Sequence, residues 1–390
     1  MRVLFSTWAW PSHLYALVPL AQACRARGHE VLIASQPRLA EELARTGLPT
    51  AVVGTDVDSV ELVRGYVLPS GPAPAPSSPA PVPAPGSGGQ GPRALRMVLD
   101  NAESMAGDLV ALAREWRPDL VVHEPTAMAG PIAAAAVGVP AVRHLYGTDL
   151  MLRARGPLTE ALAPLAARFG VIALDPFGTA TVDPTPTTLQ VPTDYRRLPM
   201  RYLPFNGMPA RQAPLSPSGR PRICVTWGHT MARLAADRFL GARVAAALTG
   251  AGAEVVLAVS AAQRPLLDGL PDGVTVVVDA ALDDLLPACD LVVAHGGAGT
   301  VLTALSHGLP LLLVPQLPDH AGHSKQVAET GAGEVLTRDE ATPEQLRAAA
   351  ARLLDEAGPA RAAARKLQHE LRTQPSPAEV ATALEALTGR

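Results

Sequence analysis

The sequence has 390 residues, of which 48% are hydrophobic and 18% are charged, and its formal net charge is −3. This length predicts two domains with a sizeable core each, and the composition excludes a disordered chain. A slightly acidic chain lacks the positive charge that nucleic-acid binding needs, so we expect no nucleic-acid partner. The three cysteines (Cys24, Cys224 and Cys289) lie far apart, which excludes a disulfide scaffold or zinc ribbon and fits a reducing cytoplasm.

The amino-terminal part of the chain predicts alternating strands and helices. Residues 2–7 form a short apolar run typical of a buried parallel strand, and apolar residues spaced by three and four predict a helix over residues 13–27. Gly28 ends this helix and residues 31–35 predict a second strand, so the segment is a βαβ unit of a parallel sheet. A further helix is expected near 95–115, followed by strands at 120–123 and 141–145.

Two apolar stretches need to be separated from targeting and membrane segments. In residues 1–23, tryptophan, proline and histidine interrupt the apolar run, which favours a strand, turn and helix over a secretory signal. The uncharged run 125–142 consists mainly of Ala, Gly and Pro, which predicts a loop and a buried helix of small residues. We therefore expect a soluble protein without a membrane span.

Two proline-rich segments are expected to lack regular structure. Residues 69–92 contain nine prolines, five glycines and no charge, which predicts a mobile, partly polyproline II loop. Such a segment serves as a lid, a binding loop or a linker, or it is an uninvolved surface insertion. Residues 171–221 are again rich in proline, and we interpret them as the crossing between two domains.

A second series of strands and helices begins after residue 221. Apolar runs predict strands at 222–226, 255–259, 274–278, 291–294 and 311–314, and helices are expected at 231–250, 281–288, 299–307, 321–330 and 343–355. The consistent interpretation is two doubly wound α/β domains that face each other across a cleft.

A glycine-rich turn follows the strand predicted at 291–294. It reads His295-Gly-Gly-Ala-Gly-Thr300 and leads into the helix expected at 299–307. The free N–H groups and the dipole of a helix start favour an anion such as a diphosphate, and glycines let it approach the backbone. The turn is neither a Walker A loop nor a GxGxxG motif. A tight turn without a ligand would not explain the histidine at the strand end, so we favour an anion site.

Three polar residues, Gln316, Asp319 and His320, follow the strand predicted at 311–314 and precede a helix. In an open α/β sheet, ligands bind at the carboxyl ends of the strands, and these groups suit hydrogen bonding to sugar hydroxyls. A simple helix cap at Asp319 stays open as an alternative. A metal site at His320 and His323 lacks a third ligand at a recognisable spacing.

His13 stands at the start of the first predicted helix, at the carboxyl end of the first strand. The positive potential of a helix start favours a neutral imidazole, which can accept a proton. A general base also needs a carboxylate that holds its tautomer. Glu124 follows the strand at 120–123 and is the candidate, whereas Asp119 precedes that strand and should lie at the other end.

In the order and spacing of these features the sequence resembles the GT-B glycosyltransferases of family 1, above all the actinobacterial branch that glycosylates antibiotic aglycones. The resemblance runs nearly end to end, apart from the proline-rich loop, and its last two motifs are highly specific. The segments that carry it are Ser12-His-Leu-Tyr-Ala-Leu-Val-Pro-Leu-Ala, Gly28-His-Glu-Val, Arg117-Pro-Asp-Leu-Val-Val-His-Glu-Pro, Arg201-Tyr-Leu-Pro-Phe-Asn-Gly, His295-Gly-Gly-Ala-Gly-Thr and Leu313-Val-Pro-Gln-Leu-Pro-Asp-His.

The resemblance implies a GT-B fold of two facing Rossmann-like domains. Residues 1–205 would bind the acceptor, and residues 217–373 would bind a nucleoside diphosphate sugar. Residues 374–390 would form a helix that crosses back to the first domain.

The resemblance also implies roles for individual residues. His13 takes the position of the base, and Glu124 falls where the family often has Asp, which keeps the carboxylate but adds a methylene. The remaining assignments are His295, Gly296, Gly297, Gly299 and Thr300 for the diphosphate; Trp227, Gly228, Val278 and Leu282 for the nucleobase and ribose; and Gln316, Asp319 and His320 for the sugar. Apart from the resemblance, we expect an apolar acceptor pocket, and ordinary core packing stays open as the alternative for its aromatic and apolar residues. The expected pocket residues are Trp8, Trp10, Ser12, Leu14, Met128 and Tyr146.

The function implied is an inverting transfer of a deoxysugar, from a dTDP donor, to a hydroxyl of a hydrophobic natural-product aglycone (polyketide, macrolide, enediyne or aromatic). We expect no cofactor besides the nucleotide-sugar co-substrate, and no metal. The alternatives are C-glycosylation of an aromatic polyketide, a sugar-nucleotide epimerase and a non-catalytic auxiliary protein. An NAD-dependent dehydrogenase is disfavoured because GxGxxG is missing. The sugar, the aglycone and the oligomeric state, a homodimer included, are left open.

Overall fold

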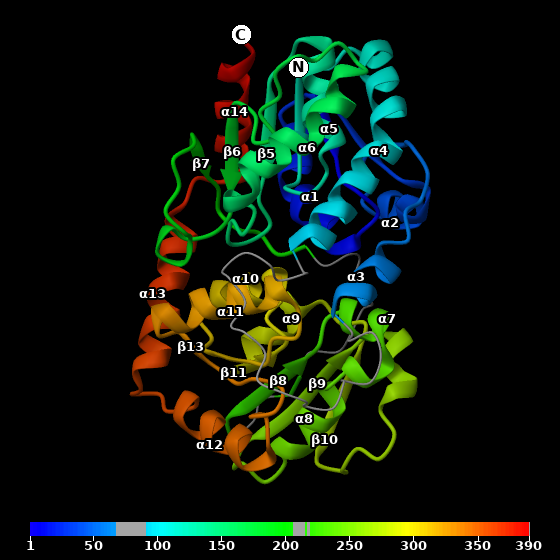
Figure 1. Cartoon of the computed structure of the whole chain (residues 1–390). Coiled ribbons are helices and arrows are strands. Elements are labelled where there is room, and N and C mark those ends of the chain that lie inside the picture. The colour runs from blue at the N-terminus through cyan, green and yellow to red at the C-terminus, as the bar shows by residue number, and fades with distance from the viewer. Residues whose placement is uncertain (68–90, 206–214, 217–218, 390) are drawn as a thin grey trace, which may run out of the picture.

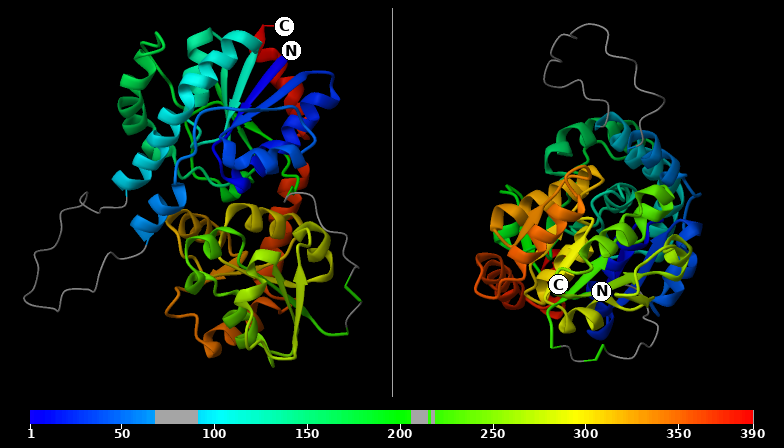
Figure 2. Two further views of the ribbon diagram at one scale, coloured as in Figure 1. Left: turned by 90° about the vertical axis from the view of Figure 1, so that its right-hand side faces the viewer. Right: turned by 90° about the horizontal axis from the view of Figure 1, so that it is seen from below.

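The structure is a computed structural model of the chain that describes residues 1–67, 91–205, 215–216 and 219–389. Two α/β units, each built on one parallel sheet, are stacked on one another (Figure 1). The two marked chain ends lie together on the amino-terminal unit, as the turned views also show (Figure 2).

The sheet of the first unit has, in the described residues, seven strands in the order β3-β2-β1-β4-β5-β6-β7, all parallel. The central strands are buried apolar runs, as expected for a sheet covered on both faces. Ser6 of β1 pairs with His123 of β4, so the loops after these two strands start side by side. The strands are β1 Arg2–Ser6, β2 Glu30–Ser35, β3 Thr50–Val52, β4 Leu120–His123, β5 Ala141–His144, β6 Ala180–Asp183 and β7 Arg197–Pro199.

Helices cover the first sheet on both faces. Leu14 of α1 and Leu384 of α14 share a core with Phe5 of β1 on one face. On the other face, Met105 of α4 and Ile132 of α5 belong to a second core. The helices of this unit are α1 Pro11–Ala26, α2 Ala40–Arg45, α3 Ser59–Val67, α4 Gly91–Trp116, α5 Ala129–Val137, α6 Arg155–Ala167 and α14 Pro377–Glu385.

The second unit contains, in the part of the chain that is described, a parallel sheet of six strands in the order β10-β9-β8-β11-β12-β13. Its strands are β8 Arg222–Thr226, β9 Glu254–Val259, β10 Val274–Val278, β11 Leu291–Ala294, β12 Leu311–Leu313 and β13 Gly333–Val335. Its helices are α7 Thr230–Leu234, α8 Gly241–Leu248, α9 Leu282–Leu285, α10 Ala298–Ser306, α11 Pro318–Thr330, α12 Pro343–Leu353 and α13 Pro359–Thr373.

The doubly wound α/β fold predicted from the sequence is confirmed, but two predicted segments are wrong. Residues 171–221 are not only a crossing, because β6 and β7 within them extend the first sheet. The single helix expected at 231–250 is broken into α7, a 3-10 turn and α8. The break at Ala235, whose backbone is extended, lets Leu234 and Phe239 enter one apolar core. The expected proline-rich loop 69–92 lies, up to residue 90, outside the described residues.

Several contacts join the two units. Val63 of α3 is buried in the core of the second unit, and Arg64 Nε donates to Leu234 O at 2.9 Å. Tyr202, beyond β7, is 3.2 Å from Gly299 O and 3.0 Å from Thr303 Oγ1 of α10. These contacts fix the carboxyl edges of the two sheets relative to each other.

A buried ion pair anchors the loop after β5. Arg143 Nη2 lies 2.6 Å from Asp149 Oδ2, and neither side chain has any exposed surface. The guanidinium also lies 3.4 Å from the centre of the Phe177 ring. The residues between this pair therefore form a loop that is tied down at both ends, and Tyr146 and Gly147 stand on it.

Replacing Asp149 by Ala is expected to lower the free energy of unfolding by about 3–5 kcal/mol, because it leaves the Arg143 charge buried without a partner. Chemical denaturation measures the change. Glu329→Ala is the matched control: its partner Lys325 is 2.6 Å away, but the two side chains are 53% and 69% exposed. The control should change stability by less than about 1 kcal/mol. Equal effects of the two substitutions would contradict the prediction.

Two buried histidines of the first sheet, His123 and His144, are expected to make the folded protein less stable in acid. Burial lowers the pKa of His123 to about 3 and that of His144 to about 4, from 6.5. Below pH 6.5 the unfolded chain therefore takes up protons that the folded chain does not, and the free energy of unfolding falls as pH drops towards about 4. Denaturation at a series of pH values tests this. His144→Asn should flatten the decline, and a wild-type protein whose stability is constant over this window would contradict it.

Candidate functional site

The structure brings His13 and Glu124 into contact. His13 lies in the first turn of α1, directly after β1, and Glu124 follows the neighbouring strand β4. His13 Nδ1 is 3.0 Å from Glu124 Oε2, while the imidazole is 13% exposed and the carboxylate is fully buried. This leaves the other ring nitrogen, Nε2, as the one available to a substrate proton. The arrangement is that of a general base held by a carboxylate.

Thr126 holds the buried carboxylate of Glu124 in place. Its backbone N–H donates to Oε2 at 2.9 Å, and its hydroxyl lies 2.9 Å from both carboxylate oxygens. These bonds compensate the charge that burial would otherwise penalise. Sequence reasoning missed Thr126, although a hydroxyl residue two positions after a carboxylate is a known turn signal.

Aromatic rings surround His13. Trp8 Nε1 lies 3.0 Å from His13 Nδ1, the same nitrogen that faces Glu124. The Tyr146 ring centre is 4.4 Å from that of the imidazole, and Trp8 stacks on Trp10 with ring centres 5.2 Å apart. One side of the imidazole is therefore enclosed by flat apolar surface.

The expected acceptor residues differ in their exposure. Ser12 is exposed and Tyr146 is half-buried, so both have surface available to a ligand. Leu14 and Met128 have no exposed surface, and the two tryptophans are almost fully buried. The acceptor pocket stays a prediction, and contact with Leu14 or Met128 would require neighbouring side chains to move.

In the second unit, β11 runs through the glycine-rich turn into α10. Gly297 is the N-cap of α10 and no side chain caps this helix, so its first N–H groups point out of the helix end. Gly296 has a φ of +88°, which disfavours other residues. A Cβ atom at Gly297 would lie 2.5 Å from His295 Nε2, and one at Gly228 would lie 2.7 Å from His295 Cε1. The His295 ring is thus confined between two glycines.

Buried polar atoms without a partner gather beside the start of α10. Burial lowers the pKa of His295 well below its usual range and also lowers that of His320, so both rings are neutral. Their ring centres lie 4.6 Å apart. Among the described residues, the buried side-chain atoms of this region that find no hydrogen-bond partner are His295 Nδ1, Gln316 Nε2, His320 Nδ1, His323 Nε2 and Ser324 Oγ. Such a cluster suits a polar ligand that supplies the missing bonds.

His323 and Ser324 were not assigned to the site from the sequence. They stand three and four residues after His320 on α11, a spacing that places all three on one face of a helix. This spacing is the signal that could have found them. Asp319 is half exposed in the first turn of α11, where it can meet a ligand. The N-cap of this helix is Leu317, so Asp319 does not take the capping position that was the alternative.

The expected nucleobase wall lies at the same edge of the sheet. Trp227 has no exposed surface, and its Nε1 donates to Gln316 Oε1 at 3.2 Å. Val278 and Leu282 are half-buried and flank the turn after β10. Trp227 therefore supports Gln316 from behind, and its role and that of Gly228 towards a base stay predictions.

The loop after β5 links the two halves of the site. Tyr146 contacts the imidazole of His13, and the next residue, Gly147, abuts the second unit. A Cβ atom at Gly147 would lie 2.7 Å from Ala298 Cβ and 2.9 Å from His323 Cε1. Tyr146 and Gly147 thus link the candidate base to the start of α10 through direct contacts.

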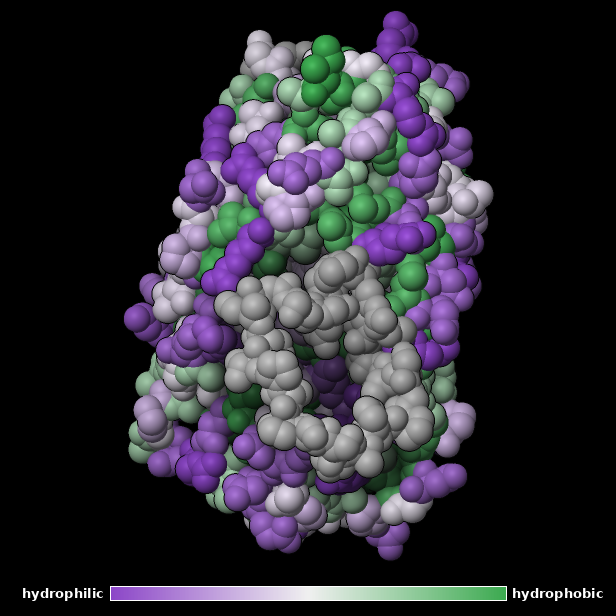
Figure 3. All heavy atoms as spheres, viewed as in Figure 1, coloured by the Kyte–Doolittle hydropathy of each residue, from purple (hydrophilic) through white to green (hydrophobic). Residues whose placement is uncertain are grey.

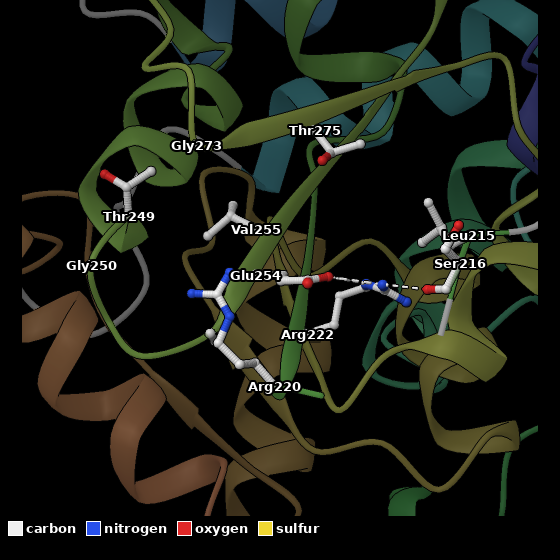
Figure 4. A pocket seen from close by; sticks show the side chains of 11 residues that line it. Leu215, Ser216, Arg220, Arg222, Thr249, Gly250, Glu254, Val255, Gly273 and Thr275 are labelled. Atoms are coloured by element: carbon white, nitrogen blue, oxygen red, sulfur yellow. Dashed lines mark hydrogen bonds and ion pairs between the residues drawn. The ribbon is translucent and has the colours of Figure 1, made fainter. Parts of the chain in front are cut away.

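A cavity of about 500 Å³ lies elsewhere in the second unit, at the amino ends of β8, β9 and β10 (Figure 4). Glu254 and Arg222 line it and form an ion pair at 2.8 Å. It lies at the opposite edge of the sheet from α10, whereas ligands of open α/β sheets bind at the carboxyl edge. It is therefore separate from the site.

The described part of the chain holds neither a cluster of metal ligands nor a membrane-spanning helix. No three His, Cys, Asp or Glu side chains are grouped there as a metal ion requires. Asp56 and Asp58 form an Asp-x-Asp pair, but each accepts a backbone N–H, from Arg38 and Glu61. None of the helices in these residues has the length and apolar character to cross a membrane. Hydrophilic residues are spread over both units on the face shown in Figure 3.

Comparison with known proteins agrees with this geometry. Residues 22–228 match the N-terminal domain model of the erythromycin biosynthesis protein CIII-like family, and residues 242–387 match its C-terminal domain model. The chain is 35% identical to 10-deoxymethynolide desosaminyltransferase of Streptomyces venezuelae, covering 100% of this chain and 98% of that protein.

Solved structures lead to the same family. The glycosyltransferase VinC in complex with dTDP is 33% identical, with a TM-score of 0.78 and full coverage of both chains. The spinosyn rhamnosyltransferase SpnG complexed with spinosyn aglycone is 29% identical, with a TM-score of 0.82 over 99% of this chain and 100% of that one. The chain therefore belongs to the erythromycin biosynthesis protein CIII-like family and is a glycosyltransferase with the GT-B fold.

Proposed function

We propose that the protein transfers a deoxysugar from a thymidine diphosphate donor to a hydroxyl of a hydrophobic natural-product aglycone, with inversion at the anomeric carbon. The observation that carries the proposal is the His13–Glu124 contact of 3.0 Å, placed one loop away from the start of α10. A base on one unit thus faces an anion site on the other.

In this proposal His13 removes the proton of the acceptor hydroxyl. Nδ1–H donates to Glu124, so the lone pair of Nε2 accepts the substrate proton. The imidazolium that forms is stabilised by the carboxylate of Glu124, which Thr126 holds in place through its backbone N–H and its hydroxyl. The alkoxide oxygen then bonds to the anomeric carbon as the bond from that carbon to the diphosphate oxygen breaks.

The start of α10 would bind the leaving diphosphate. Its N–H groups are not capped by a side chain, and they are oriented before the reaction begins, which is where electrostatic stabilisation is most effective. With the diphosphate on this unit and His13 on the other, the hydroxyl approaches the anomeric carbon from the opposite side. This placement favours inversion.

Related proteins support the choice of donor and acceptor. One solved relative binds dTDP and another binds a spinosyn aglycone, and the desosaminyltransferase named above acts on 10-deoxymethynolide. The half-buried ring of Tyr146 beside His13 suits an apolar acceptor of this kind. The buried polar atoms around His320 suit the more polar donor.

Replacing His13 by Ala is expected to lower kcat about 10²- to 10⁴-fold, the usual loss when a general base is removed. Sugar transfer to an alcohol acceptor measures the effect. Binding of thymidine diphosphate, followed by calorimetry, should stay unchanged in the same variant, because His13 lies on the other unit. Full turnover by His13→Ala would refute the assignment of the base.

Replacing Gly297 by Ala is expected to weaken binding of thymidine diphosphate, because the added Cβ would lie 2.5 Å from His295 Nε2 and displace that ring. The ligand raises the melting temperature of the wild-type protein by binding the folded state, and this rise should be smaller in the variant. Gly107→Ala is the control, since its Cβ would meet no atom within 4 Å. A rise as large as that of wild type would argue against a diphosphate site at α10.

A further inference from the structure

Trp8 and Glu124 compete for one nitrogen of His13. Trp8 Nε1 and Glu124 Oε2 each lie 3.0 Å from His13 Nδ1. An indole N–H only donates and a carboxylate only accepts, while a ring nitrogen of a neutral imidazole either carries a proton or accepts one. The two hydrogen bonds therefore exclude each other.

Each bond corresponds to one tautomer of the imidazole. If Nδ1 carries the proton, it donates to Glu124, and Nε2 has the lone pair that a base needs. If Nδ1 accepts from Trp8, the proton is on Nε2, which then cannot act as the base. The surroundings of the ring thus contain a donor that favours the inactive tautomer and a carboxylate that favours the active one.

The remaining hydrogen bonds show why Trp8 can compete with a charged group. In the inactive tautomer Glu124 keeps its bonds from the Thr126 N–H and hydroxyl, so the carboxylate is still satisfied. In the active tautomer the Trp8 N–H, which makes no other hydrogen bond to the described residues, loses its acceptor on a side chain that is almost fully buried. An unsatisfied buried donor is costly.

We propose that Trp8 is a positioning residue that shifts His13 towards the Nε2–H tautomer and so limits the basicity of the free enzyme. The inference rests on the proposed function, since it concerns the same base. Trp10 stacks on Trp8 at an interplanar angle of 21°, which keeps the indole N–H directed at the imidazole. Among the described side chains that contact this ring, Glu124 and Tyr146 are the titratable ones.

The location of the proton can be measured directly by nitrogen NMR of the histidine side chains, with the signal of His13 assigned from its loss in His13→Asn. Trp8→Phe keeps an aromatic ring and removes the N–H, so the nitrogen chemical shifts of His13 should move towards those of the Nδ1–H tautomer. Trp10→Phe is the matched control: it removes an indole N–H that is not bonded to His13 and keeps a ring that can stack on Trp8, so the proton distribution should stay as it is. Glu124→Gln removes the carboxylate and should move the signals towards Nε2–H.

The pH profile of kcat/KM gives a second readout that a packing role would not change. Loss of an inactive neutral tautomer raises the plateau of kcat/KM at high pH by some factor. The midpoint of the acid limb moves to higher pH by the logarithm of that factor, while kcat/KM at low pH stays unchanged. Benzothienylalanine at position 8 replaces the indole N–H by sulfur in a bicyclic ring of the same size. It is the second variant for both measurements if Trp8→Phe does not fold.

An unchanged proton distribution in both position-8 variants would overturn the inference. The NMR measurement does not depend on turnover, so the outcome is independent of the proposed function. Full activity of His13→Ala would refute the base but leave the tautomer result intact. Conversely, suppose that His13→Ala is inactive and that the tautomer populations of His13 in the position-8 variants equal those of the wild-type protein. This outcome would refute only the role of Trp8.

Discussion

The proposed chemistry depends on one contact, between His13 Nδ1 and Glu124 Oε2. The contact exists because β1 and β4 are neighbouring parallel strands in register, so that the first turn of α1 and the residue after β4 meet at the same edge. A buried carboxylate would be unfavourable there without the bonds from Thr126. The extra methylene of Glu124, relative to Asp, is accommodated within this set of bonds.

The proposed donor side differs in its hydrogen bonding. His295, His320 and Ser324 are buried but keep polar atoms without partners, and the histidines are neutral. Proteins normally satisfy such groups with internal hydrogen bonds, so several of them gathered in one place suit a polar ligand. The two parts of the proposed site thus differ: beside His13 the Glu124 carboxylate is held by hydrogen bonds within the protein, whereas beside His320 polar atoms stay available to a ligand.

The sequence predicted the fold class, most of the strands and the His13–Glu124 contact, because buried parallel strands and the polar residues that follow them leave strong local signals. It did not predict β3, β7 or β13, which are short edge strands with half-buried or exposed residues. The buried strand β6 was missed as well, because its four residues lie within a proline-rich segment. Nor did it reveal that Trp8 and Trp227 are almost wholly buried. Burial depends on what packs against a side chain, and α3 and Gln316 come from distant parts of the chain.

The place of α14 has a consequence for how the protein is made. Val380, Ala381 and Leu384 belong to the same apolar core as Leu14 and Phe5, and Arg27 binds Glu385 at 3.0 Å. Along the sequence, the second unit therefore lies between the two segments that form the first unit, namely the amino-terminal part of the chain and α14. During synthesis the later-made unit is free to fold as soon as it leaves the ribosome, whereas the earlier one must wait, with an open hydrophobic face, until residue 384 has emerged. For this chain the core that is begun first in translation is therefore the one that needs the last-made helix to be complete.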